Sequence, residues 1–145
     1  MPLKTATRII IRFAFFVAYA GIITWLSLTS HPPRIGIKWL SWDKVQHALA
    51  YFLLTFFAGR AFIALVLSRK KAWFLAFVFS IIFGSLMEVA QGTFSRVRGA
   101  DAYDILANAC GALAIYLLAC LIPQISGKPV HAARPSPDPG NTTNS

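Results

Sequence analysis

The stretch GSLMEVAQGTFSRVRGADAYDILANACG, residues 84–111, decides how this chain is organised. It joins two long apolar segments, yet it is rich in polar and charged residues: Glu88, Gln91, Arg96, Arg98, Asp101, Asp104 and Asn108. Another acidic residue, Asp43, begins a further apolar segment, and Lys44, His47 and Tyr51 follow it closely. Ionisable groups are costly inside a bilayer. Their concentration in these stretches therefore indicates one shared polar site rather than single polar residues that are each tolerated on their own.

The composition places the chain among membrane proteins. Hydrophobic residues make up 57% of it and charged residues only 13%, whereas soluble domains carry about 25% charged residues. The net charge of +9 would suit nucleic acid, but the basic residues lie at the ends of apolar runs, as expected beside anionic lipid. We therefore expect the lipid bilayer as the main partner and no nucleic acid. The sequence does not indicate an oligomeric state.

The apolar runs predict an all-α fold, a four-helix transmembrane bundle formed by residues 1–123. A helix of about 20 residues spans a hydrocarbon core of about 30 Å. The predicted spans are residues 9–28, 44–67, 72–91 and 104–122. The aromatic residues within 37–42 predict a short segment lying at the membrane interface. Residues 124–145 are rich in proline and glycine, which predicts a disordered C-terminal tail.

The helix order predicts where the polar residues meet. Four spans place both termini on one side, and basic residues are more numerous there and in the 69–71 turn, which predicts cytoplasmic termini. The start of the second span, the end of the third and the start of the fourth then share the outer face. We predict a ligand-binding pocket there, formed by Asp43, Lys44, His47, Tyr51, Glu88, Gln91, Arg98, Asp101, Asp104 and Asn108.

The spacing of these residues supports facing helical stripes. His47 and Tyr51 are four residues apart, Glu88 and Gln91 are three apart, and Asp104 and Asn108 are four apart, so each pair lies on one side of its helix. A carboxylate that faces lipid is disfavoured, whereas one that faces a basic group is stabilised. We therefore expect Glu88 to contact His47 or Arg98, with Tyr51 and Asn108 forming the deeper floor.

The same residues resemble a known family. Asp43-Lys44-x-x-His47-x-x-x-Tyr51, then Glu88-x-x-Gln91, then Arg98-x-x-Asp101-x-x-Asp104-x-x-x-Asn108-x-x-Gly111 are similar to the VanZ-like family of small bacterial membrane proteins. The resemblance covers roughly residues 40–120 and leaves out the tail. It implies a bacterial inner-membrane protein of the cell envelope, and it implies no established reaction. The family is named after a protein associated with glycopeptide (teicoplanin) resistance, so resistance or envelope homeostasis is the expected context, although the resemblance does not imply that this chain itself confers resistance.

Three interpretations of the site remain open. In the structural one, the charged residues only join the helix ends by ion pairs. In the binding one, Arg98 grips a phosphate or carboxylate of an anionic lipid or lipid-linked envelope precursor, while Asp101, Asp104 and Asn108 accept or donate hydrogen bonds. In the enzymatic one, a membrane-embedded hydrolase or transferase uses His47 as a base, or holds a divalent metal, with Glu88 and Asp104. We favour a non-enzymatic role, with no cofactor and no resident metal.

Overall fold

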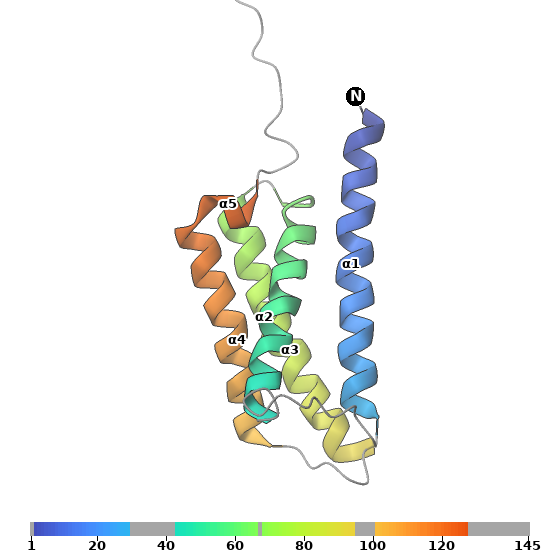
Figure 1. Ribbon diagram of the computed structural model, residues 1–145, viewed down its shortest axis with the longest axis vertical. Coiled ribbons are helices and arrows are strands. Elements are labelled where there is room, and N and C mark those ends of the chain that lie inside the picture. Colours follow the sequence, from blue (N-terminus) through green and yellow to red (C-terminus); the bar gives the residue numbers. More distant parts are fainter. Residues whose placement is uncertain (1, 30–42, 67, 95–100, 128–145) are drawn as a thin grey trace, which may run out of the picture.

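The computed structural model describes residues 2–29, 43–66, 68–94 and 101–127, and within these ranges the chain forms helices and turns and no strand (Figure 1). The predicted all-α class is therefore confirmed. Four long helices are followed by one helical turn: α1 (Pro2–Leu28), α2 (Asp43–Phe62), α3 (Arg69–Phe94), α4 (Ala102–Leu121) and α5 (Pro123–Ser126).

Three of the described helices are long and apolar enough to cross a membrane. They are the segments Thr5–Leu28 of α1, Arg69–Thr93 of α3 and Ala102–Leu121 of α4. Helix α2 is not among them, although it is as long as α4, because its polar start DKVQH and Arg60 lower its apolarity. It also ends at Phe62, whereas the predicted span continued to residue 67. The amides of Ala64 and Leu65 donate to carbonyls three residues back, at 3.0 and 2.9 Å, which tightens the chain into a turn.

The other helix bounds also differ from the predicted spans. Helix α1 begins at Pro2 rather than residue 9, because the basic residues before the apolar run are themselves good helix formers. The first residues of the predicted tail form α5, with Pro123 at its first position, where a missing amide hydrogen costs nothing. The predicted interfacial segment, 37–42, and the rest of the tail, 128–145, lie outside the described residues.

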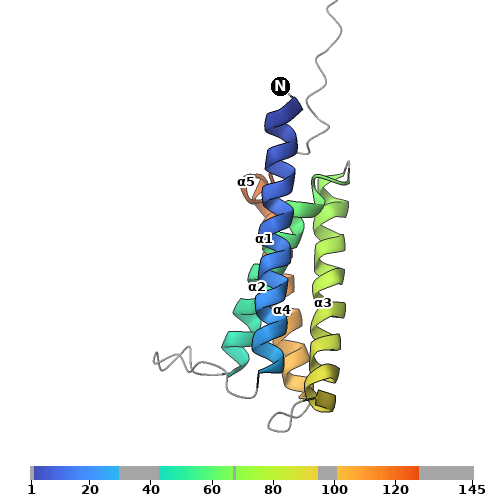
Figure 2. The ribbon, with the colours of Figure 1, turned by 90° about the vertical axis from the view of Figure 1, so that its right-hand side faces the viewer.

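Helices α2, α3 and α4 all pack against one another, and α1 packs on α2 and α3 (Figure 2). The core has two parts: one is formed by Ile23, Tyr51 and Leu54, and the other by Trp73, Ile115 and Ala119. Helix α1 extends past the other helices at its N-terminal end (Figures 1 and 2). The three-helix unit α2–α4 therefore contains most of the packed interior.

The contact between α2 and α4 depends on Gly111. A Cβ atom at this position would overlap the carbonyl oxygen of Ala48, so only glycine allows the two backbones to come this close. Both helices begin at the same end of the molecule (Figure 1). Between this contact and the helix starts, Lys44 therefore lies opposite Asp104, and His47 lies opposite Asn108.

Candidate functional site

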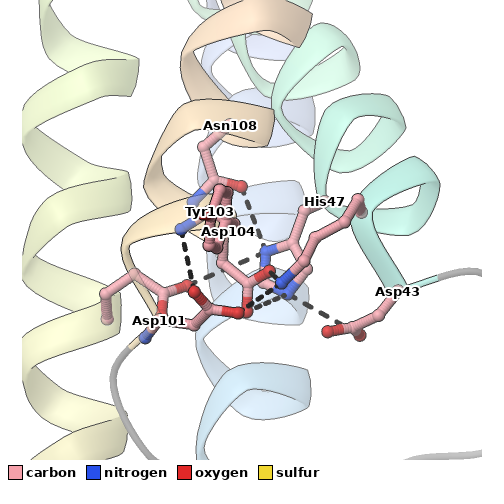
Figure 3. A network of polar contacts seen from close by, with 8 residues as sticks. Asp43, His47, Asp101, Tyr103, Asp104 and Asn108 are labelled. Carbon is pink, nitrogen blue, oxygen red and sulfur yellow. Dashed lines mark hydrogen bonds and ion pairs between the residues drawn. The ribbon is translucent and has the colours of Figure 1, made fainter.

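A network of polar side chains lies where α2 and α4 begin and α3 ends (Figure 3). We call it the polar cluster, and it consists of Asp43, Lys44, His47, Glu88, Asp101, Asp104 and Asn108. The cluster draws residues from three helices and from the residue before α4. The structure thus brings together seven of the ten predicted site residues.

Lys44 joins the first turn of α2 to the start of α4. Its Nζ donates to Asp101 Oδ2 at 2.5 Å and also to Asp104 Oδ1. Asp101 is the N-cap of α4, because its Oδ1 accepts the backbone amide of Tyr103 at 2.8 Å. Donation from Lys44, and secondly from the Tyr103 amide, holds the pKa of the Asp101 carboxyl below its ordinary value.

His47 is surrounded by acceptor groups on both sides of its ring. Its Nδ1 lies 3.1 Å from Asn108 Oδ1 and 3.8 Å from Glu88 Oε1. Because an amide oxygen only accepts, a hydrogen bond between these two atoms requires the proton to be on Nδ1. The opposite nitrogen, Nε2, lies 3.6 Å from Asp104 Oδ2 and 3.9 Å from Asp43 Oδ1. Nε2 is thus the ring atom available for a proton or a cation.

Glu88 lies in the last two turns of α3, where the helix dipole disfavours a carboxylate, and it is only 1% exposed. The His47 ring compensates on one side, at 3.8 Å. On the other side Glu88 Oε2 accepts the backbone amide of Asp101 at a long 3.4 Å. The predicted contact between Glu88 and His47 is confirmed, and Glu88 ties the end of α3 to the start of α4.

The cluster contains one set of side chains with the spacing of metal ligands. One atom each of Asp43, His47 and Asp104 lie within 4.8 Å of one another. The set proposed from sequence used Glu88 in place of Asp43. The structure favours Asp43 because it lies one turn before His47 on α2, on the Nε2 side of the ring, whereas Glu88 lies on the Nδ1 side. Imidazole and carboxylate together suit a divalent transition metal.

Beneath the cluster lie two buried hydrogen-bond donors. Tyr51 is 3% exposed and Asn108 is 2% exposed, yet among the described residues Tyr51 Oη and Asn108 Nδ2 have no hydrogen-bond partner. Gly84 of α3 makes room between them, since a Cβ there would lie 2.9 Å from Tyr51 Cε1 and 3.2 Å from Asn108 Nδ2. The sequence pattern did not indicate Gly84 as a site residue, although it lies one turn before Glu88.

Three of the predicted site residues do not belong to the polar cluster as described: Tyr51, which lies beneath it, Gln91 and Arg98. Gln91 is buried on α3, one turn beyond Glu88, at the same end of the molecule. Arg98 and its neighbour Arg96 lie outside the described residues. Without them the cluster has four carboxylates and one lysine, so its described part is negatively charged and attracts cations or neutral hydrogen-bond donors.

No family model, curated protein or solved structure matches this chain. The resemblance to the VanZ-like family therefore stays a prediction. The functional argument rests on the geometry of the polar cluster and on the apolar helices around it.

Proposed function

We propose that this chain is a multi-pass protein of the bacterial inner membrane in which α1, α2, α3 and α4 all cross the bilayer. Helix α2 packs against each of the three apolar helices, and at about 1.5 Å per residue it approaches 30 Å in length. Its Lys44 and His47 face carboxylates of the neighbouring helices rather than lipid, which supports insertion despite its polar start. The excess of basic residues near the termini supports cytoplasmic termini and a polar cluster at the outer face.

Cysteine labelling tests this topology. In a variant without Cys110 and Cys120, both of which are exposed, single cysteines replace Gly36, Lys70, Ser95 and Ser136. We expect an impermeant maleimide to label Gly36→Cys and Ser95→Cys in intact cells, and Lys70→Cys and Ser136→Cys only after permeabilisation. Labelling of Gly36→Cys and Lys70→Cys from the same side would show that α2 does not cross. Outside labelling of Lys70→Cys and Ser136→Cys, with Gly36→Cys and Ser95→Cys protected, would contradict the orientation.

The polar cluster, in this proposal, binds the headgroup of an anionic lipid or a lipid-linked envelope precursor. The supporting observation is the pair of buried donors, Tyr51 Oη and Asn108 Nδ2, that have no partner among the described residues. An unsatisfied buried polar group costs about 1–3 kcal/mol. A cluster that only joined helix ends has no use for two of them, whereas a ligand oxygen placed beside Gly84 would accept from both.

The charges of the cluster indicate that a ligand would need two chemically different parts, one that donates hydrogen bonds and one that is anionic. Exposed carboxylate oxygens of Asp43 and Asp101 suit the hydroxyl or amide donors of a sugar or peptide. The negative charge of the ligand would be repelled there and requires the arginines that precede α4 in the sequence, Arg96 and Arg98, whose planar guanidinium groups match phosphate. A headgroup with both anionic and hydroxyl-rich parts therefore fits better than a simple anion.

The proposal includes membership of the VanZ-like family. The support is that seven of the residues carrying the resemblance, separated by up to about 60 positions in the chain, meet in one cluster. A role in glycopeptide resistance or envelope homeostasis follows from that resemblance alone.

A second candidate function is enzymatic. The His47 ring donates through Nδ1 to Asn108 and presents Nε2 to Asp43 and Asp104, which is the arrangement of a general base or a metal ligand. A hydrolase or transferase acting on the same lipid-linked substrate would use it. Conversion of the copurified species on addition of Zn²⁺ or Mn²⁺, lost in His47→Gln, would favour this candidate over simple binding.

Mass spectrometry of copurifying lipids and envelope precursors tests the binding proposal. We expect Arg98→Lys and Tyr51→Phe each to reduce the bound species at least several-fold, because the first loses the two-pronged contact and the second loses the donor. Thermal stability should be unchanged in both. Tyr103→Phe is the matched control, since the Tyr103 side chain is exposed. Equal amounts of bound species in wild type and all three variants would contradict the headgroup site.

A further inference from the structure

Two arginines face each other at the end of the molecule opposite to the polar cluster. Helices α1 and α2 are antiparallel, and their aromatic rings pair Phe15 with Phe57 at 6.1 Å and Phe16 with Phe62 at 5.6 Å. This register brings Arg12, one turn before these α1 rings, level with Arg60 in the last turn of α2. Their charges are close enough to repel each other. Arg60 lies about 25 Å along α2 from Asp43.

No carboxylate of the described residues is available to this arginine pair. The chain has five acidic residues, and four of them belong to the polar cluster at the other end. The fifth, Asp138, lies outside the described residues. Within the described part of the chain, Arg12 Nη1 is buried without a hydrogen-bond partner. In the ranges that the structure describes, the acceptor of Arg60 Nη1 is a neutral one, the carbonyl of Ile125, at 3.4 Å.

The surroundings of the pair are those of a lipid headgroup site. Beside Arg12, the side chains of Ile10, Ile11 and Phe15 are exposed on α1 and suit acyl chains. On the other side, Gly127 closes over the Arg60 guanidinium, where a side chain would overlap it. The pair also lies level with the end of α2, because Arg60 is in the last turn of that helix. It is therefore at the level expected for phosphates rather than deep among hydrocarbon.

We infer that Arg12 and Arg60 together bind one phosphate group of an anionic phospholipid. Two guanidinium groups without a carboxylate are disfavoured next to each other, and a phosphate placed between them offers acceptor oxygens to both. In a membrane the phospholipid supplies this phosphate at the right level, along with apolar chains for the exposed face of α1. The inference needs only a membrane environment and is independent of any ligand of the polar cluster.

Native mass spectrometry of the full-length protein in neutral detergent, titrated with phosphatidylglycerol, tests this site. We expect Arg12→Gln and Arg60→Gln each to weaken phosphatidylglycerol binding about tenfold or more, and the double variant to be little worse than either, because both hold one phosphate. Arg8→Gln is the matched control: it removes the same charge from an exposed position one turn before Arg12 on α1. We expect it to change binding less than about twofold.

Four results would overturn the inference. A loss in Arg8→Gln equal to that in Arg12→Gln would show attraction to general surface charge. If phosphatidylcholine bound as tightly as phosphatidylglycerol, the site would not distinguish a zwitterionic lipid from an anionic one. Full competition by millimolar inorganic phosphate, with equal stabilisation, would assign the site to soluble phosphate. Stronger lipid binding in Asp138→Asn would show that the chain's own carboxylate occupies the pair. If Arg12→Gln does not fold, Arg12→Lys must still weaken binding. Lysine keeps the positive charge but cannot make the two parallel hydrogen bonds of a guanidinium group.

Discussion

Gly111→Ala is expected to destabilise the protein by about 3 kcal/mol, the upper part of the usual range for overpacking. The added methyl group meets the carbonyl oxygen of Ala48, and a backbone atom cannot rotate away as a side chain would. Helices α2 and α4 must therefore move apart. Unfolding of the purified protein in detergent, followed by circular dichroism against temperature or denaturing detergent, measures the loss.

Gly21→Ala is the control for this change. It adds the same methyl group to a helix glycine that has nothing within 4 Å of the new Cβ, so the variant should be as stable as wild type or gain up to about 1 kcal/mol from helix propensity. Separation of α2 and α4 would also draw Lys44 away from Asp104, so bound lipid should fall only in Gly111→Ala. Equal stability of the two variants would contradict the close backbone contact.

Lys44→Met is expected to lower the unfolding midpoint of the protein, by less than the loss of one partner from a fully buried pair would. The change leaves Asp101 and Asp104 side by side without their shared cation. Asp104 carries most of the cost, because its side chain is 9% exposed while those of Lys44 and Asp101 are 30% and 41% exposed and are better solvated. Lys70→Met, at an exposed position on α3, should change stability by less than about 0.5 kcal/mol.

A double-mutant cycle separates this ion pair from other effects of the substitution. Adding Asp104→Asn to Lys44→Met removes the uncompensated carboxylate, so the double variant should recover part of the stability lost in Lys44→Met. An unfolding midpoint of Lys44→Met equal to that of wild type would mean that Lys44 does not hold α2 to α4, and the role of the cluster in stability would then be small.

The sequence predicted the meeting of the polar residues better than the exact contacts between them. Helix order alone places Asp43, Glu88 and Asp104 at one end of the molecule, and the cost of turning a carboxylate toward lipid predicts the contact of Glu88 with His47. It does not say which acid receives Lys44. That choice depends on the register of α2 against α4, which Gly111 determines through a contact with a residue more than 60 positions away.

Two further features were missed because they arise only in the packed structure. The early end of α2 at Phe62 depends on a local change to three-residue hydrogen bonding, which hydropathy does not report. The arginine pair depends on the aromatic register between α1 and α2. In the sequence Arg12 and Arg60 are two isolated charges in apolar runs, and each on its own is compatible with an ordinary snorkelling side chain.

The weak apolarity of α2 has a consequence for biogenesis. On the four-span topology proposed above, α2 enters the bilayer with Lys44 and His47 near one end, and its neutralising partners lie on α3 and α4, which are synthesised later. Its stable insertion must therefore be completed after synthesis of the acids that neutralise it, as a cooperative event of the α2–α4 unit. Helix α1, which contributes nothing to the polar cluster, can enter first and alone. The acids that form the candidate site would thus also be required to complete the assembly of the membrane domain.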